Sequence, residues 1–164
     1  MIHEVSGDIL LTKAQAIAHG VAPNDDFKQG LAHVLHEQWP AMVKDFRHWC
    51  HQSNPKPGGA WIWGGPDGHR IINLLTQEPP KSAGQHPGPA HLNYVNHALK
   101  DLHKILKKEK IASLAMPKIA TGVGNLDWND VLPLIEKHLA PLSIPIIIYS
   151  EYHAGVQAKE PAIE

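Results

Sequence analysis

One stretch decides the fold, Ile111–Leu139, which reads IASLAMPKIATGVGNLDWNDVLPLIEKHL. Its first six residues, 111–116, are apolar over the length of a strand, and Pro117 bounds them. A glycine-containing segment follows at 121–125, and after it apolar residues recur at helical spacing on one face. These residues are Trp128, Val131, Leu132, Ile135 and Leu139. The stretch therefore predicts a strand, a glycine loop and an amphipathic helix.

The glycine loop is the first candidate ligand site. Glycine permits positive φ and has no Cβ to block a close ligand. The free N–H groups and the dipole at a helix N-terminus both favour negative charge. Thr121–Asn125 is therefore a candidate cradle for a phosphate or a diphosphate. An ordinary turn that contains two glycines remains the alternative interpretation.

Two other phosphate-binding patterns are absent from the sequence. The run Gly122–Asp127 lacks the third glycine of the dinucleotide fingerprint, and it lies near the C-terminus instead of opening the fold. The pattern GxxxxGK[ST] occurs nowhere, which excludes a P-loop NTPase. The predicted anion site is therefore of a different kind.

Three motifs precede this stretch in a fixed order: GDIL at 7–10, AIAH at 16–19 and QGLA at 29–32. Together with MPKIATGVGNLDW at 116–128, they resemble the macro domain, the ADP-ribose-binding module. The resemblance extends over roughly residues 1–150. It looks closest to the branch with the terminal ADP-ribose protein glycohydrolase and the DNA ADP-ribosyl glycohydrolase antitoxins.

The resemblance implies a role for each matched position. Asp8 would accept a hydrogen bond from the adenine amino group, with the backbone of Ile9 beside it, and Tyr152 would pack on the adenine. Asp8 could instead cap a turn, and Tyr152 could be an ordinary surface residue. The diphosphate and the distal ribose would be wrapped by Gly30, Thr121, Gly122, Val123, Gly124 and Asn125.

The catalytic lysine implied by the resemblance is missing. In these glycohydrolases a lysine follows the threonine after the fourth strand, whereas Thr76 is followed here by Gln77. An amide cannot form the Schiff-base-type intermediate that an amine forms. The acidic partner in the glycine loop corresponds to Gly124, so it is absent too. Lys81, in the Pro/Gly-rich loop 78–90, is either a displaced nucleophile or a solvated lysine.

His19 is the better candidate for catalysis. It ends the second predicted strand, and a histidine at the matching place occurs in the ADP-ribose 1″-phosphate phosphatase branch. Histidine can act as a base near neutral pH. Asp25 or Asp26 could orient a water, and we take His19 and Asp26 as the predicted catalytic pair. A hydrogen-bonding role for His19 in the cleft wall is the alternative.

The sequence thus predicts an ADP-ribose-binding domain that removes ADP-ribose adducts as a hydrolase, without the usual lysine and without a cofactor. The expected partner is ADP-ribose or an ADP-ribosylated macromolecule. Three alternatives stay open: a non-catalytic ADP-ribose reader, an ADP-ribose 1″-phosphate phosphatase that uses His19, and a vestigial site.

Composition limits the partners and the cellular compartment that we expect for this protein. The formal net charge of −1 gives little reason to expect sequence-specific nucleic-acid binding. A single cysteine, Cys50, excludes an internal disulfide and fits a reducing compartment. No apolar run reaches the roughly 18 residues of a membrane span, so we expect a cytoplasmic monomer. The His-rich segment 48–51 has no common zinc spacing, and no metal is predicted.

Helical patterns alternate with apolar strands along the 164 residues. This alternation predicts a single-domain α/β protein with a largely covered sheet. The resemblance to macro domains implies a three-layer α/β/α sandwich with a mixed central sheet. The predicted domain spans residues 1–154. Residues 155–164 carry scattered charges and no periodicity, which predicts a flexible C-terminal tail.

Overall fold

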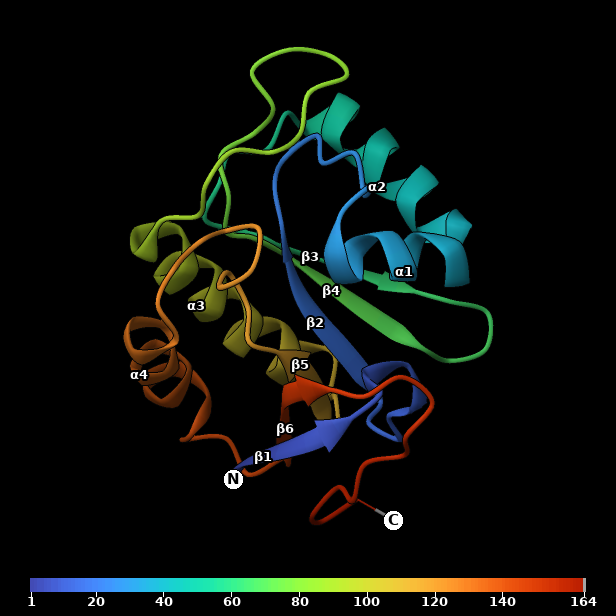
Figure 1. The fold of residues 1–164 in the computed structure, drawn as a ribbon, viewed down its shortest axis with the longest axis vertical. Helices are drawn as coiled ribbons and strands as arrows, with labels where there is room; N and C mark the ends of the chain where they lie inside the picture. The colour runs from blue at the N-terminus through green and yellow to red at the C-terminus, as the bar shows by residue number, and fades with distance from the viewer. Residues whose placement is uncertain (164) are drawn as a thin grey trace.

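The computed structural model describes residues 1–163, and a six-stranded sheet lies at its centre (Figure 1). The strand order is β1-β6-β5-β2-β4-β3, and only β3 runs antiparallel to its neighbour. The strands are β1 (Ile2–Gly7), β2 (Ala16–Val21), β3 (Ala60–Gly64), β4 (Arg70–Leu75), β5 (Leu114–Pro117) and β6 (Ile146–Tyr152). The sheet is therefore mixed, as the sequence predicts.

Helices cover both faces of the sheet (Figure 1). Helices α1 (Gly30–Gln38) and α2 (Pro40–Ser53) lie on one face. Helices α3 (Leu92–Lys108) and α4 (Trp128–Leu139) lie on the other, and a short 3-10 helix, η1 (Ile9–Leu11), follows β1. The predicted three-layer α/β/α sandwich is confirmed.

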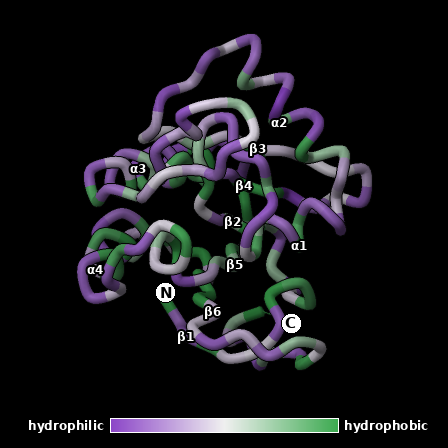
Figure 2. The backbone as a smooth tube through the Cα atoms, turned by 45° about the horizontal axis from the view of Figure 1, so that its top comes forward, coloured by the Kyte–Doolittle hydropathy of each residue, from purple (hydrophilic) through white to green (hydrophobic). Residues whose placement is uncertain are grey.

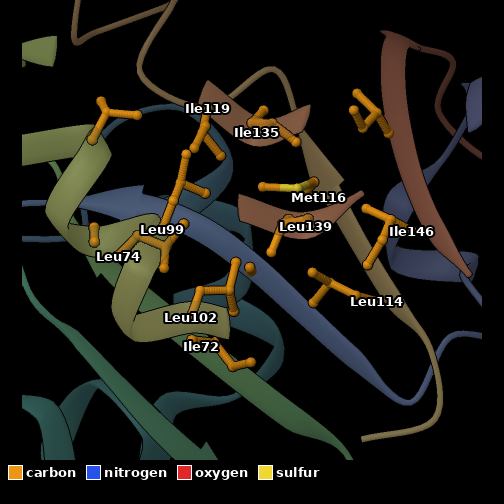
Figure 3. Close-up of a cluster of buried hydrophobic side chains, with 14 of the residues drawn as sticks. Ile72, Leu74, Leu99, Leu102, Leu114, Met116, Ile119, Ile135, Leu139 and Ile146 are labelled. Atoms are coloured by element: carbon orange, nitrogen blue, oxygen red, sulfur yellow. The ribbon is translucent and has the colours of Figure 1, made fainter. Parts of the chain in front are cut away.

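The buried side chains form one core on each face of the sheet. Alternate residues of a strand point to opposite faces, so Ile72 and Leu74 of β4 join the core under α3 and α4, whereas Ile71 joins the core under α1 and α2. In the first core, Leu99 and Leu102 of α3 lie over the sheet (Figure 3). Hydrophobic residues accordingly concentrate along the inner strands, and the outer loops are mostly hydrophilic (Figure 2).

The parallel strands bring several connecting segments to one edge. Parallel neighbours share their direction, so the carboxyl ends of β1, β6, β5, β2 and β4 meet on the same side of the sheet. The segments that leave this side include 22–29 after β2, 76–91 after β4 and 118–127 after β5. In open α/β sheets this is the side where ligands bind.

The C-terminal segment contacts the strand ends. The N–H of Asp8 donates to the Val156 carbonyl at 2.7 Å. The Glu160 carboxylate accepts from the backbone N–H of Lys13 and from the Tyr149 hydroxyl, each at 2.8 Å. These contacts differ from the loose tail that the sequence predicts for 155–164, because the partners of Glu160 are distant in sequence and leave no periodic signal. Within residues 1–163, no helix combines the length and apolarity of a membrane span.

Candidate functional site

A pocket of about 190 Å³ opens at the carboxyl edge of the sheet, between the ends of β2 and β5. Sites that hold a whole drug-sized ligand typically measure about 300–1,000 Å³, so this pocket accommodates one end of a larger ligand. Its lining residues come from the three segments that follow β2, β4 and β5. They are His19, Gly20, Asp25, Gln29, Gly30, Leu31, Ala32, Gln77, Pro87, Pro117, Lys118, Ile119, Ala120, Gly122, Val123 and Gly124.

The two glycines of the loop after β5 have different structural roles, although both line the pocket. A Cβ on Gly122 would meet no atom within 4 Å. A Cβ on Gly124 would lie 2.7 Å from the Ala120 carbonyl oxygen and 2.8 Å from Ala90 Cβ. Gly124 is therefore required by the packing of the loop against the segment before α3, whereas Gly122 leaves space on the pocket side.

Neither loop glycine supplies positive φ, which corrects our expectation from the sequence. The left-handed residues are Ala120, with φ 63°, and Asn125, with φ 65°. Backbone bonds hold this turn, from Leu126 N–H to the Ala120 carbonyl at 2.9 Å and from Asn125 N–H to the Gly122 carbonyl at 3.0 Å. The glycines therefore provide space for close approach. Thr121 and Asn125 do not line the pocket, and the Thr121 hydroxyl donates to the Lys118 carbonyl at 2.7 Å.

The N-terminus of α1 forms the opposite wall. Gly30 begins this helix with φ +58°, and a Cβ there would meet nothing within 4 Å. The cap residue Gln29 makes no side-chain bond to the first turn, whose N–H groups have no intrahelical acceptor. The pocket therefore presents a helix N-terminus and an open glycine loop to the same ligand, an arrangement that favours an anion.

His19 lies at the floor of the pocket and is only 2% exposed. Its Nε2 donates to the Asn73 side-chain oxygen at 2.7 Å, and its Nδ1 has no partner. Because Oδ1 of Asn73 can only accept, the proton belongs on Nε2 and the lone pair on Nδ1. Burial lowers the pKa of His19 to about 4, against a smaller opposing effect of the Asn73 bond, so the ring is neutral at physiological pH.

Of the two aspartates after β2, Asp25 lines the pocket and Asp26 does not. The Asp25 carboxylate accepts from the N–H groups of Ala22 at 2.9 Å and Phe27 at 2.8 Å. Burial raises the pKa of Asp25, although these bonds oppose the rise.

Asp26 points toward the Pro/Gly-rich loop after β4. Its carboxylate lies 2.9 Å from Nδ1 of His86 and also accepts from the N–H of Lys28 at 3.2 Å. Asp26 thus connects the loops after β2 and β4, and Asp25 is the aspartate that the fold brings to the pocket of His19.

Gln77 lines the pocket at the position where the resemblance implies a lysine. Its Nε2 donates to the Gly88 carbonyl at 3.0 Å, which fastens the loop 78–90 beside the pocket. Lys81 is exposed and does not line the pocket, but Lys118 does. The Lys118 ammonium lies 5.8 Å from the centre of the Trp128 ring. Sequence reasoning missed Lys118, although its place directly after the strand-ending Pro117 could have indicated it.

Asp8 lies in a separate corner at the end of β1 and is 7% exposed. One carboxylate oxygen accepts from Leu10 N–H at 3.0 Å and caps η1, and the other accepts from Gly155 N–H at 2.9 Å. Each oxygen retains acceptor capacity for a ligand. Tyr152 lies across from Gly7 in the β1–β6 register and is 59% exposed, whereas Ile9 is buried. None of these residues lines the pocket between β2 and β5.

Metal ligands do not gather in the part of the chain that the structure covers. Among residues 1–163, no group of three or more His, Cys, Asp or Glu side chains could hold a metal ion. The side chains that line the pocket include a neutral imidazole, a buried carboxyl group, an amide and an amine.

Comparison with known families and sequences gives a consistent result. A family model described as the Macro domain matches residues 9–135. The chain is 29% identical over 134 residues to the DNA ADP-ribosyl glycohydrolase of Mycobacterium tuberculosis, which covers 80% of this chain and 36% of that protein. It is 26% identical over 159 residues to a DNA ADP-ribosyl transferase–DNA ADP-ribosyl glycohydrolase fusion protein of Thermosipho africanus, covering 88% and 40%. The chain thus spans well under half the length of these relatives.

Solved structures share the fold. The macrodomain of Mycobacterium tuberculosis DarG matches with a TM-score of 0.81 and 27% identity, over 91% of this chain and 97% of that one. The macrodomain of Thermus aquaticus DarG matches with a TM-score of 0.79 and 23% identity, over 92% and 98%. Thermosipho africanus DarTG in complex with ADP-ribose matches with a TM-score of 0.78 and 21% identity, over 95% and 42%.

Proposed function

Because the chain belongs to the macro domain family, we propose that it binds ADP-ribose and hydrolyses ADP-ribosyl linkages without a lysine nucleophile. The observation that carries the proposal is the pocket in which the N-terminus of α1 and the loop Gly122–Gly124 face each other. Relatives named for DNA ADP-ribosyl glycohydrolase activity support the reaction class.

The proposed ligand has two ends, and the chain offers a place for each. The diphosphate and the distal ribose occupy the pocket between Gly30 and Gly122, where free N–H groups meet the negative charge. The adenine extends to the corner of Asp8, which keeps acceptor capacity for the exocyclic amine. Tyr152 presents an exposed ring beside that corner, suited to stacking. The small volume of the pocket is consistent with its holding only the diphosphate and the distal ribose, with the adenine outside it.

The proposed chemistry is attack of water on the anomeric carbon of the distal ribose. The C–O or C–N bond to the modified group breaks, one water proton passes to the Nδ1 lone pair of His19, and a proton goes to the departing group. Asp25, whose pKa is raised by burial, is placed in the same pocket to supply that proton. Asp26, which pairs with His86, positions the loop after β4 instead.

A non-catalytic ADP-ribose reader is the second candidate, and a specific observation favours it. Gln77 stands at the lysine position and its amide is bonded to the Gly88 carbonyl. Nδ1 of His19 is enclosed in the floor, so water must enter before the ring can act as a base. A reader needs only the anion-binding walls and the adenine corner, which are independent of His19.

The decisive experiment separates binding from turnover. Calorimetric titration with ADP-ribose, with ATP and NAD as controls, should give a Kd in the micromolar range, about −8 kcal/mol. Release of ADP-ribose is then measured from ADP-ribosylated DNA, ADP-ribosylated protein and ADP-ribose 1″-phosphate. We expect His19→Ala to lower the rate roughly 100-fold or more and to leave the affinity for ADP-ribose nearly unchanged.

The outcomes distinguish the candidates. Binding without turnover on any substrate decides for the reader, and turnover confined to ADP-ribose 1″-phosphate decides for the phosphatase. Borohydride should trap no covalent adduct, because Gln77 cannot form an imine. A trapped adduct that maps to Lys118 or Lys81 would instead establish a displaced-lysine mechanism. Absence of ADP-ribose binding at millimolar concentration would refute the proposed site.

A further inference from the structure

A second surface feature lies away from the pocket, in the groove between α3 and α4. This α3–α4 groove measures about 480 Å³ and shares no lining residue with the pocket. Positively charged and titratable side chains dominate its lining. They are His97, Lys100, His103, Lys104, Lys137 and His138.

The positive charge of the groove is uncompensated. None of the three lysines has a carboxylate within 4.0 Å among residues 1–163. The nearby acidic residues, Asp101 on α3 and Glu136 on α4, do not line the groove. Asp101 is turned toward Gly59, with Oδ2 3.5 Å from the position of a Cβ there. The whole chain carries a formal net charge of −1, so the fold has segregated this positive charge onto one face.

Hydrogen bonds join the two helices at the groove. His103 Nδ1 on α3 donates to the His138 carbonyl on α4 at 2.7 Å. His138 Nε2 in turn donates to the side-chain oxygen of Asn96 at 2.7 Å. These bonds keep like charges together: burial lowers the pKa of His138, and the positive charges of Lys137, His103 and Lys100 lower it further. An anion in the groove would relieve this repulsion.

The lysines of the groove come from both helices. Lys100 and Lys104 are one turn apart, roughly 6 Å along the axis of α3, and Lys137 faces them from α4. Like charges at this spacing destabilise a helix, so a polyanion that neutralises them gains affinity. No Phe, Tyr or Trp is among the residues that line the groove, which leaves no platform for base stacking.

We propose that the α3–α4 groove binds the phosphate backbone of a nucleic-acid strand, independently of base sequence. The same two helices begin at the rim of the pocket, since the N–H of Ala90, just before α3, donates to the Gly124 carbonyl at 3.0 Å, and α4 follows the glycine loop. A nucleic-acid strand bound in the groove therefore lies beside the two helices whose N-termini are near the pocket. The inference does not depend on turnover in the pocket.

Fluorescence anisotropy with two labelled 15-nucleotide single-stranded DNAs of unrelated sequence tests the proposal. We expect similar affinities for both, with Kd roughly between 10⁻⁴ and 10⁻⁶ M and a steep dependence on salt. The triple variant K100Q/K104Q/K137Q should weaken binding at least 10-fold at 50 mM salt. Its slope of log affinity against log salt should fall by about 2, because each lost phosphate contact on a single strand removes about 0.7.

The matched control is K44Q/K56Q/K159Q, which removes the same charge from exposed lysines outside the groove. Its affinity should stay within about 2-fold of the parent. Equal losses in both triple variants, an unchanged salt slope, strong preference for one sequence, or no binding by the parent chain would each overturn the proposal. Thermal melting verifies that both variants fold. Calorimetry with ADP-ribose should be unaffected by K100Q/K104Q/K137Q, so failure of the groove is distinguishable from failure of the pocket.

Discussion

The two ends of the proposed ADP-ribose site differ in how many of their hydrogen-bonding groups already have partners within the protein. At the glycine loop, a side chain on Gly122 would meet no atom, and the N–H groups of the first turn of α1 lack intrahelical acceptors. At the adenine corner, both oxygens of Asp8 already accept backbone N–H groups, one of them from Gly155 in the C-terminal segment. One end is open to a ligand, and the other is braced by the chain itself.

This difference predicts that the two ends respond differently to mutation. Changes at the open end should affect ligand binding and leave the fold intact, because few protein atoms depend on it. Changes at the braced corner should affect binding and stability together, because the same carboxylate serves the fold and the ligand. A variant series that gave the same pattern at both ends would break the comparison.

The largest expected effect is at Gly122. Gly122→Val places a branched side chain where the diphosphate must approach, so the affinity for ADP-ribose should fall more than roughly 1,000-fold, about 4 kcal/mol. The melting temperature should stay near that of the parent, since the position is open. Calorimetry and thermal melting measure the two quantities. Normal binding by this variant would show that the diphosphate cradle lies elsewhere.

The next largest expected effect is a loss of folding stability at acidic pH. Because the pKa of His19 falls from 6.5 in the unfolded chain to about 4 in the fold, the unfolded chain takes up this proton first as the pH drops. The stability that depends on neutral His19 is fully present above pH 6.5 and is lost toward pH 4, by up to about 3 kcal/mol. Urea unfolding across this range measures the loss.

A His19→Gln variant is the control for the acid effect, because it removes the titrating ring from the floor. Its free energy of unfolding should depend less steeply on pH between 6.5 and 4 than that of the parent. Equal slopes for the two proteins would mean that His19 is not the group responsible. If His19 is the general base, its neutral form should persist down to about pH 4, so loss of turnover through protonation of this ring should begin only near that pH.

At the braced corner, Asp8→Ala should weaken ADP-ribose binding by about 1.5–3 kcal/mol, since it deletes a charge-assisted hydrogen bond. Unlike Gly122→Val, it should also lower the melting temperature, because the cap of η1 and the contact with Gly155 are lost. Asp8→Asn, which keeps an acceptor oxygen, should lie between the two proteins. Unchanged affinity in Asp8→Ala would mean that this residue only caps the turn.

The smallest effect is expected where the C-terminal segment docks. Tyr149→Phe removes the hydroxyl that donates to Glu160 at 2.8 Å, and should cost roughly 1 kcal/mol of stability. The parent hydroxyl should also titrate far above its usual range, because burial and the bond to Glu160 raise the pKa of Tyr149. Affinity for ADP-ribose should change little. A large loss of affinity would instead show that the docked segment sets the geometry of Asp8.

The sequence by itself determined the order of the elements and the class of fold. The apolar run at 111–116 predicted the strand that the structure has at Leu114–Pro117, and local spacing likewise predicted the glycine loop and the helix from Trp128. Alternating helices and strands predicted an α/β fold. The motif around Asp8 and the loop 121–125 could likewise be picked out in advance. The strand and helix signals lie within short windows of residues, where spacing reflects the burial of one face, whereas Asp8 was identified by the resemblance to macro domains.

The tertiary structure decided which side chains meet. Only the fold shows that Asp25 lines the pocket while Asp26 reaches His86, that Lys118 lies in the pocket and Lys81 outside it, and that Glu160 docks on Tyr149. The basic groove also exists only where α3 and α4 pack together, because its lysines are scattered along the chain. Such contacts depend on the direction of side chains from elements distant in sequence. No local pattern encodes that direction, so the chemistry of the pocket and the charge of the groove appear only after packing.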